Sequence, residues 1–311
     1  MNTDRIKNIV DVKKLQQSRV AVIGIGGSME ITEGLVRCGV GSIIAIDPDT
    51  IEASNVARQG HDEIGEKKVR AAEKRLRKIN SKLDFLGIAL RHDQIPEMHW
   101  KELLTECDLL ILATDSFEAQ SFGNRLALTT KTPALWIGLY AGATAGEIVW
   151  WTPSHADCFR CLLERRYLRQ KQNQSDPGSD DALFQDLQIV DGIAGQIALG
   201  LLTRGSDNYF GRLIDRLGPR QFLQIKLRHD WLLDGVDPVA KALQIPADND
   251  SYFCWSTSAR MNGPRLFPCP DCEQLLGRRF EDEECIAVEV PSSSDGEDEL
   301  DCAPALDRLG L

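Results

Sequence analysis

The stretch Val20-Ala21-Val22-Ile23-Gly24-Ile25-Gly26-Gly27 decides the fold of this 311-residue chain. Its first four residues are a short apolar run that ends at a glycine-rich turn, and residues 30–37 then carry apolar side chains at helical spacing. A second apolar run, residues 42–46, ends at Asp47. A strand, a glycine turn, a helix and a second strand that ends at an acid are typical of the first unit of a parallel α/β sheet.

Further apolar runs continue this pattern along the chain. Strands are predicted over residues 85–90, 109–113 and 134–139, with 146–151 beside the last of them and a further strand over 222–228. A basic helix is predicted over 70–79 and a buried one over 189–203, whereas 169–186 is polar and predicted to be a loop. No clear periodicity is found over 230–267. The pattern favours an α/β fold with a doubly wound, mostly parallel, Rossmann-like sheet.

The glycine turn also predicts a nucleotide site. Gly24, Gly26 and Gly27 let the backbone approach a phosphate, the following helix directs N–H groups at an anion, and Asp47 can hold ribose hydroxyls. Met29 stands where a third glycine would permit the closest packing of helix and strand. The alternative is a glycine turn of an α/β domain that binds no ligand.

Three polar residues further along indicate the kind of chemistry. Asn55, Arg58 and Lys68 follow the Asp47-Pro48-Asp49 segment closely in sequence. A dehydrogenase has no need for them beside its pyrophosphate loop. Attack of a carboxylate on the α-phosphate of ATP, however, builds negative charge, which cations, amide donors and Mg²⁺ stabilise. The segment therefore favours nucleotidyl transfer.

These motifs resemble the ThiF/MoeB/HesA family, which includes the adenylation domains of ubiquitin-activating enzymes. The family pattern is a G-x-G-G turn, R-x-G-V-G, D-x-D, S-N-x-x-R-Q, I-G-x-x-K and a later T-D. In this chain it corresponds to Gly24 to Gly27, Arg37 to Gly41, Asp47 with Asp49, Ser54 to Gln59, Ile64 to Lys68, and Thr114-Asp115. The resemblance covers residues 18–205 and a cysteine pair near residue 270.

The resemblance implies a role for each matching residue. Asp47 would bind the ribose of ATP, and Asp115, after Thr114 at the end of a strand, would hold Mg²⁺. The implied contacts to the rest of the nucleotide come from Asp49, Asn55, Arg58, Gln59, Lys68 and Thr114. Arg58, Lys68 and Asp115 would be catalytic. The alternative makes Arg58 and Lys68 surface charges and Asp115 a helix N-cap.

Two C-x-x-C pairs predict a structural zinc site. The pairs are Cys158 with Cys161 and Cys269 with Cys272, and four thiolates can bind Zn²⁺ tetrahedrally. Four protein ligands leave no open position for a substrate. The alternative is two pairs of reduced thiols without a metal.

The loop 162–191 contains no cysteine, although many relatives carry their nucleophile there. Three interpretations remain open. The reaction stops at the acyl-adenylate and another protein attacks it; a loop serine, Ser179 or Ser175, forms an oxyester, with Asp180, Asp181 or His155 as the base; or Cys254 swings in.

The predicted function is ATP-dependent adenylation of the C-terminal carboxylate of a small ubiquitin-like or sulfur-carrier protein. A conjugating enzyme is a further possible partner. Family members are commonly homodimers, and Trp136, Trp150 and Trp151 are candidate interface residues. The compact chain favours a bacterial system. The alternatives are a peptide-modifying adenylyltransferase of the same family and an NAD-dependent oxidoreductase.

The net charge of −11 lies almost entirely at the C-terminus. Residues 281–311 hold eleven Asp and Glu against one basic residue, Arg308. The acidic balance excludes a main role in nucleic-acid binding. No apolar run is long enough to cross a membrane, and reduced cysteines without a visible signal peptide favour the cytoplasm. We expect an adenylation domain over 1–205, a portion completing the zinc site over 206–285, and a disordered acidic tail over 286–311.

Overall fold

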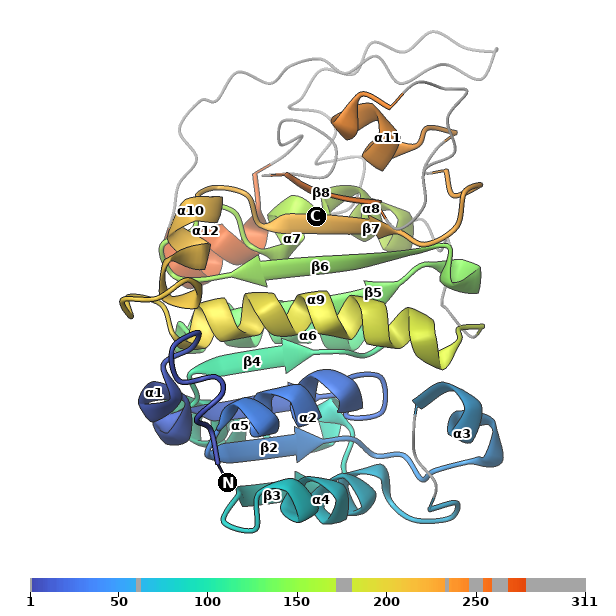
Figure 1. Cartoon of the computed structure of the whole chain (residues 1–311). Helices are drawn as coiled ribbons and strands as arrows, with labels where there is room; N and C mark the ends of the chain where they lie inside the picture. The colour runs from blue at the N-terminus through green and yellow to red at the C-terminus, as the bar shows by residue number, and fades with distance from the viewer. Residues whose placement is uncertain are drawn as a thin grey trace, which may run out of the picture.

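A computed structural model describes residues 2–59, 63–171, 181–232, 235–245, 254–258 and 268–277. Within these ranges the strands form one eight-stranded sheet in the order β3-β2-β1-β4-β5-β6-β7-β8 (Figure 1). Its strands are β1 (Arg19–Ile23), β2 (Ser42–Ile46), β3 (Asp84–Ile88), β4 (Leu109–Leu112), β5 (Ala134–Leu139), β6 (Ala145–Trp151), β7 (Phe222–Lys226) and β8 (Cys254–Ser258).

The sheet has a parallel part and an antiparallel part. Strands β3, β2, β1, β4 and β5 pair in parallel, whereas β6, β7 and β8 are added antiparallel at the β5 side. The predicted α/β, doubly wound class is confirmed. Because β7 and β8 belong to the predicted portion 206–285, that portion extends the same sheet.

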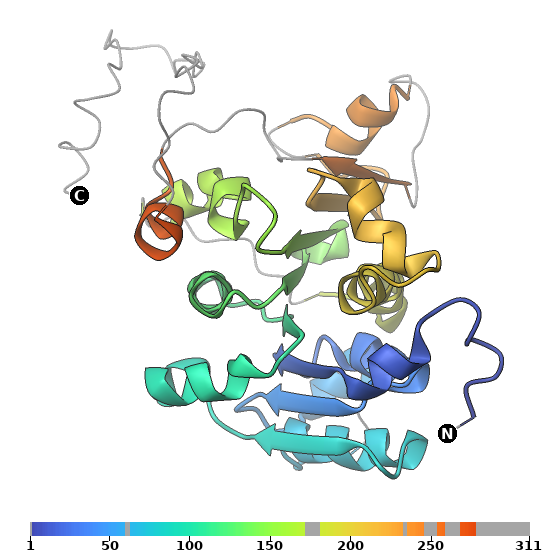
Figure 2. The ribbon, with the colours of Figure 1, turned by 90° about the vertical axis from the view of Figure 1, so that its left-hand side faces the viewer.

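Helices cover both faces of the sheet (Figure 2). The helices α1, α2, α4, α9 and α10 lie on one side, and α5, α6, α7 and α12 lie on the other. Their bounds are α1 (Val12–Gln17), α2 (Met29–Cys38), α4 (Lys68–Ile79), α5 (Glu97–Thr105), α6 (Phe117–Thr130), α7 (Phe159–Leu162), α9 (Phe184–Leu202), α10 (Leu213–Leu217) and α12 (Pro270–Leu276); the remaining helices are α3 (Ala53–Gln59), α8 (Glu164–Lys171) and α11 (Pro238–Leu243), with the short turns η1 (His92–Gln94), η2 (Ala141–Ala143) and η3 (Phe210–Arg212).

Two cores explain why the strands read as unbroken apolar runs. In β1, Val20 and Val22 belong to the core under α2 and α9, whereas Ala21 and Ile23 belong to the core under α6. Successive side chains of a strand point to opposite faces, so a strand covered on both sides needs apolar residues throughout.

Three sequence predictions need correction. The polar segment 169–186 includes the end of α8 and the start of α9, so the part without a described helix is shorter than predicted. The region without periodicity, 230–267, contributes α11 and β8. The three candidate interface tryptophans are at most 2% exposed, so they belong to the core of this chain and offer no surface to a partner; they are Trp136, Trp150 and Trp151.

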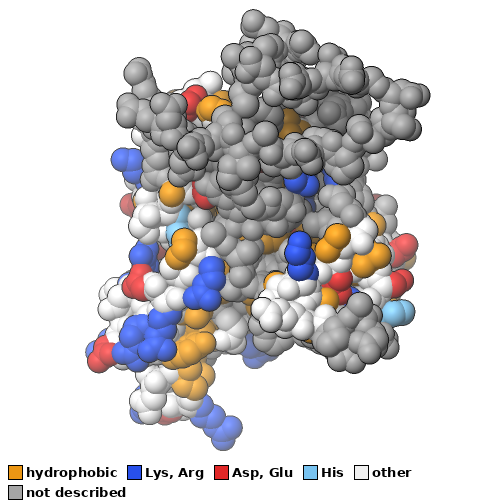
Figure 3. Space-filling model, turned by 90° about the horizontal axis from the view of Figure 1, so that it is seen from above, with side chains coloured by type: hydrophobic (Ala, Val, Ile, Leu, Met, Phe, Trp, Pro, Cys, Tyr) orange, Lys and Arg blue, Asp and Glu red, His pale blue; other side chains and the backbone are white. Residues whose placement is uncertain are grey.

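Two further expectations concern membrane-spanning helices and the acidic tail. None of the described helices combines the length and apolarity that crossing a membrane requires. The predicted acidic tail lies outside the described ranges. Seen from the β8 end, the described part of the surface carries a mixture of basic, acidic and apolar side chains (Figure 3).

Candidate functional site

The glycine turn lies where the order of the parallel strands reverses. Strands β1 and β4 are neighbours there. Sheets of this topology bind ligands outside the carboxyl ends of such strands, and we call this edge, where β1, β2 and β4 end, the crevice. Gly24 has a φ of +88°, and a Cβ on it would lie 2.5 Å from the carbonyl oxygen of Ala113. Ser28 Oγ donates to the carbonyl oxygen of Gly24 at 2.8 Å, just before α2 begins at Met29. Both the conformation and the space at position 24 therefore require glycine.

Asp47 connects the glycine turn to the segment that follows β2. It is 4% exposed, and its carboxylate accepts from the backbone N–H of Gly26 at 3.3 Å and of Asp49 at 2.9 Å. Burial raises the pKa of Asp47, while nearby Lys68 acts in the opposite direction. Each carboxylate oxygen has two lone pairs, so Asp47 retains acceptor capacity for a further donor.

Lys68 is the buried cation of this site. Its Nζ lies 2.9 Å from Asp49 Oδ2, and its side chain is 9% exposed against 60% for that of Asp49. Its backbone N–H also donates to the carbonyl oxygen of Asp49 at 3.0 Å. Asp49 and Lys68, each predicted as a nucleotide contact, are thus held together, with the ammonium group partnered by a carboxylate.

Helix α3 carries the predicted amide and guanidinium groups beside this segment. Asn55 is half-buried, and its Oδ1 accepts from the backbone N–H of Glu52 at 3.0 Å. Arg58 is half-buried on the same helix, which packs against α9. The side chain of Gln59 lies outside the described residues.

Thr114 and Asp115 follow β4 after a single residue, Ala113. Ser116, and not Asp115, is the N-cap of α6, because Ser116 Oγ accepts from the backbone N–H of Ala119 at 3.2 Å. Gln120 holds the turn from the helix by donating to the carbonyl oxygen of Thr114 at 2.8 Å. Asp115 is exposed and has no polar partner among the residues that the structure describes. The alternative interpretation of Asp115 as a helix cap is therefore wrong.

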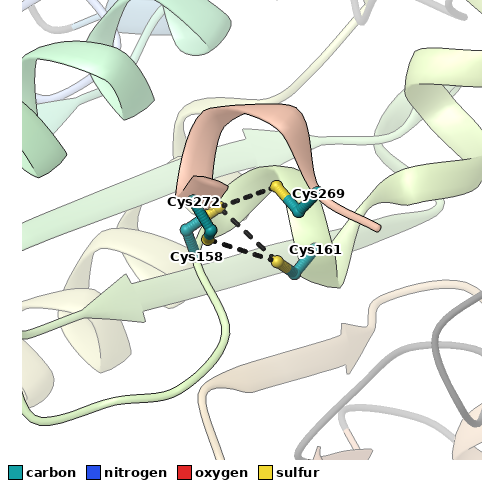
Figure 4. A group of neighbouring side chains, drawn as sticks. All are labelled: Cys158, Cys161, Cys269 and Cys272. Atoms are coloured by element: carbon teal, nitrogen blue, oxygen red, sulfur yellow. Dashed lines mark hydrogen bonds between the residues drawn. The ribbon is translucent and has the colours of Figure 1, made fainter. Parts of the chain in front are cut away.

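The four cysteines of the two C-x-x-C pairs meet on the α6 side of the sheet (Figure 4). All four are buried, and the sulfur atoms lie 3.7 Å apart for Cys158 and Cys161, 3.7 Å for Cys158 and Cys269, and 3.6 Å for Cys161 and Cys272. Four thiolates at about 2.3 Å from a tetrahedral zinc would have sulfur–sulfur distances of about 3.8 Å. The donor set fits a zinc ion.

A polar brace holds α12 against the rest of the domain beside these cysteines. Asp271 accepts from Asn124 Nδ2 at 2.8 Å and from Arg160 Nη1 at 2.9 Å. Asn124 Oδ1 in turn accepts from the backbone N–H of Phe159 at 3.1 Å. Burial raises the pKa of the Cys158 thiol well above its usual range, whereas hydrogen bonds from the other three cysteines lower the pKa of Cys269.

The candidate nucleophiles are not brought to the crevice by any described contact. Ser175, Ser179 and Asp180 lie outside the described residues, as does the side chain of Cys254, whereas Asp181 is exposed. His155 follows β6 at the edge where β5 begins, opposite to the glycine turn. Its ring contacts the backbone N–H of Thr152 and the carbonyl oxygen of Gly218, and burial lowers its pKa. His155 is therefore not the base of this site.

The sequence analysis missed a buried polar cluster between α8, β5 and β6. Arg166 Nη1 lies 2.7 Å from Glu147 Oε1, and Tyr140 donates its hydroxyl to Glu147 at 2.8 Å. A Cβ on Gly138 would lie 3.3 Å from the Glu147 side chain, which explains a glycine in the facing strand. The sequence signal for this cluster was a glutamate, Glu147, inside the apolar run 145–151.

Parts of this chain are similar in sequence to proteins of known name. It is 34% identical to the sulfur carrier protein ThiS adenylyltransferase of Bacillus subtilis over 161 residues, which cover 49% of this chain and 46% of that protein. It is 30% identical to mouse ubiquitin-like modifier-activating enzyme 5 over 226 residues, 66% of this chain and 54% of that protein. The chain thus spans about half the length of these curated relatives.

Solved structures agree in fold. Escherichia coli MccB crystallised with ATP superposes with a TM-score of 0.53 at 18% identity, over 71% of this chain and 64% of that one. PaaA superposes with a TM-score of 0.54 at 17% identity, over 75% of this chain and 82% of that one. The family model described as "ThiF family" matches residues 4–204, a range that includes the glycine turn, Asp47, Lys68 and Asp115. The chain belongs to the ThiF family.

Proposed function

We propose that this protein is an ATP-dependent adenylyltransferase that activates the C-terminal carboxylate of a small ubiquitin-like or sulfur-carrier protein. The observation that carries the proposal is the meeting of the Gly24–Gly27 turn, Asp47 and Asp115 at adjoining strand ends in a ThiF-family chain. Relatives named as a ThiS adenylyltransferase and as ubiquitin-like modifier-activating enzymes support the same class of acceptor.

In the proposed reaction, an oxygen of the acceptor carboxylate attacks the α-phosphorus of ATP. The bond from that phosphorus to the bridging oxygen breaks, and pyrophosphate leaves with the electron pair. The amino end of α2 faces the phosphates, and its N–H groups favour their negative charge. Asp47 would use its remaining acceptor capacity for the ribose hydroxyls, and Asn55 and Arg58 would approach from α3; the family resemblance implies the same for Gln59.

Asp115 is the residue proposed to hold Mg²⁺. Its exposed carboxylate without a partner among the described residues fits this ion, which prefers oxygen ligands and binds proteins through one or two carboxylates. When bound, the ion neutralises charge on the phosphate oxygens. Lys68 is held on Asp49, so phosphates that recruit it would compete with that carboxylate.

The four cysteines are proposed to hold a structural zinc ion. All four ligand positions are filled by buried sulfur atoms, so the ion would join α7 to α12 and take no part in the transfer. A homodimer and a conjugating enzyme as a second partner stay within the proposal as predictions. The described residues place no thiol at the crevice, and we therefore propose the acyl-adenylate as the product. An ester on Ser179 remains a prediction.

ATP–pyrophosphate exchange tests the proposal. With a candidate acceptor whose C-terminus is free, exchange is expected with wild type and is expected to fall by about 1000-fold or more in Asp115→Ala, the effect of losing a metal-binding carboxylate. Asp84→Ala is a matched control, because it changes an exposed carboxylate at the start of β3, at the edge of the sheet opposite to the crevice. Exchange that survives Asp115→Ala would contradict the metal assignment.

Mass spectrometry of the product separates the alternatives. The proposal expects AMP to leave when a nucleophile is added, so the acceptor gains no lasting nucleotide mass. A nucleotide that stays on a peptide would support a peptide-modifying adenylyltransferase instead. ThiF-family membership and the position of Asn55, Arg58 and Lys68 argue against an NAD-dependent oxidoreductase.

A further inference from the structure

Helix α9 places a carboxyl group inside the protein beside the first turn of α2, the helix that follows the glycine turn. Asp191 is 2% exposed, and its Oδ2 accepts from the backbone N–H of Ile31 at 3.3 Å. Its Oδ1 is buried without a hydrogen-bond partner among the described residues. A buried carboxyl that is only half satisfied is costly, and no part of the sheet or the zinc cluster needs it.

The donor to Asp191 belongs to the first turn of the helix that faces the proposed nucleotide. Ile31 is the third residue of α2, so its N–H lies roughly 3 Å along the axis from that of Met29. A phosphate at the amino end of α2 would then lie on the order of 6–8 Å from the Asp191 carboxyl. The two groups would share the positive end of one helix dipole.

The surroundings of Asp191 disfavour its ionised form. Burial is the largest cause that raises the pKa of Asp191 well above its usual range, and the charge of Glu30 on α2 acts in the same direction. Glu30 is itself paired with Arg75 of α4 at 2.8 Å.

Other elements packed against α9 supply few charges. Strands β5 and β6 turn Ile137 and Ile148 toward it, and Asp115 follows β4 at the crevice. Helix α3 carries Arg58, and η3 and α10 meet the opposite end of α9; the charged residues of these last two elements are Arg212, Asp215 and Arg216.

We propose that Asp191 sets the nucleotide affinity of this site: its neutral carboxyl admits the triphosphate, and its ionised carboxylate opposes it. The inference rests on the proposed function, because it requires the phosphates at the amino end of α2. As the pH rises, loss of the Asp191 proton places a negative charge behind the phosphates. At an effective dielectric constant of about 20, unit charges at this separation weaken binding on the order of tenfold or more.

Calorimetric titration of Mg²⁺ and the ATP analogue AMPPNP into wild type and Asp191→Asn, from pH 6 to pH 9, tests the inference. The asparagine keeps an oxygen that accepts from Ile31 but cannot ionise. Protonation of the ligand affects both proteins equally, so it cancels in the ratio of their two dissociation constants. We expect wild type to lose about tenfold or more in affinity relative to Asp191→Asn over this range. Parallel curves for the two proteins would overturn the inference.

Two further measurements keep the test decisive. Glu30→Gln removes the neighbouring charge and is expected to retain the pH-dependent loss of affinity, shifted to lower pH. Should Asp191→Asn fail to fold, wild type alone is titrated at pH 8 in buffers of different ionisation enthalpy. Net proton uptake on binding supports the inference, and no uptake contradicts it. Absence of AMPPNP binding by wild type at every pH would instead refute the proposed function.

Discussion

The crevice at the strand ends and the cluster of four cysteines are built in opposite ways. The crevice gathers short segments that each follow a parallel strand, and it leaves Asp115 exposed to a ligand. The cluster joins two pairs that are 111 positions apart in the chain, and it buries all four sulfur atoms. The first is open where chemistry needs access, whereas the second is closed and ties α12 to the domain.

The two regions also differ in how the charges of their buried groups are compensated. At the crevice, Asp47 is buried with only partial compensation from Lys68, so the site is costly for the fold. At the cysteines, a cation surrounded by the four sulfur atoms would compensate the charge of the thiolates. We therefore expect substitutions at the cluster to affect mainly stability, and substitutions at the crevice to affect mainly binding.

The largest expected change in stability is at the cluster. Cys272→Ser removes one of four ligands and is expected to lower the melting temperature by about 10 °C or more, because a bound metal contributes to folding. The zinc content, measured by mass spectrometry of the purified protein, should fall from about one ion per chain. Cys38→Ser, at a half-buried cysteine outside the cluster, is the control. The assignment would be contradicted if the wild-type protein contained no zinc and Cys272→Ser left the melting temperature unchanged.

A smaller and pH-dependent change is expected at the crevice. Lys68→Gln should lower the free energy of unfolding by about 2 kcal/mol at pH 7, because it leaves Asp47 ionised and buried beside Asp49. A raised native pKa means that the folded protein keeps a proton that the unfolded chain has lost, so ionisation of Asp47 costs stability as the pH rises above the usual carboxyl range. Lys68 reduces this cost, and its substitution should therefore matter less at pH 4.

Urea denaturation of both proteins at pH 4 and pH 7 measures this difference. Lys74→Gln is the matched control, since Lys74 is 60% exposed in its pair with Glu66 and should change stability by less than about 0.5 kcal/mol at either pH. An equal loss at both values of pH for Lys68→Gln would show that Lys68 does not act on stability through the ionisation of Asp47.

Sequence reasoning worked best where periodicity and position along the chain carry the information. The seven strands it predicted all pair in the observed sheet, because a strand covered on both faces must be apolar throughout. The α2 and α4 helices were also predicted, since their apolar residues recur at helical spacing. The strand β8 and helix α11 were missed because their segment shows no such period.

Apart from the meeting of the two cysteine pairs, contacts between distant segments could not be predicted from the sequence. The sequence marked Asp47, Lys68 and Asp115 individually, but the partnership of Lys68 with Asp49 and the cap at Ser116 are visible only in three dimensions. Glu147 and Asp191 each stand singly in an apolar segment, and neither belongs to a motif. Their roles depend on the groups that the fold places beside them. Glu147 lies beside Arg166, and Asp191 lies beside the first turn of α2.

The central claim is that the glycine turn at the strand ends binds the nucleotide, and two glycines of one segment test it directly. Calorimetric titration with Mg²⁺ and AMPPNP should give about one site per wild-type chain. Gly24→Ala should abolish this binding, because its Cβ would lie 2.5 Å from the Ala113 carbonyl oxygen at a φ of +88°. Gly34→Ala, in α2 with no atom within 4 Å of the added Cβ, should bind as wild type does. Unchanged binding by a folded Gly24→Ala protein would contradict the account.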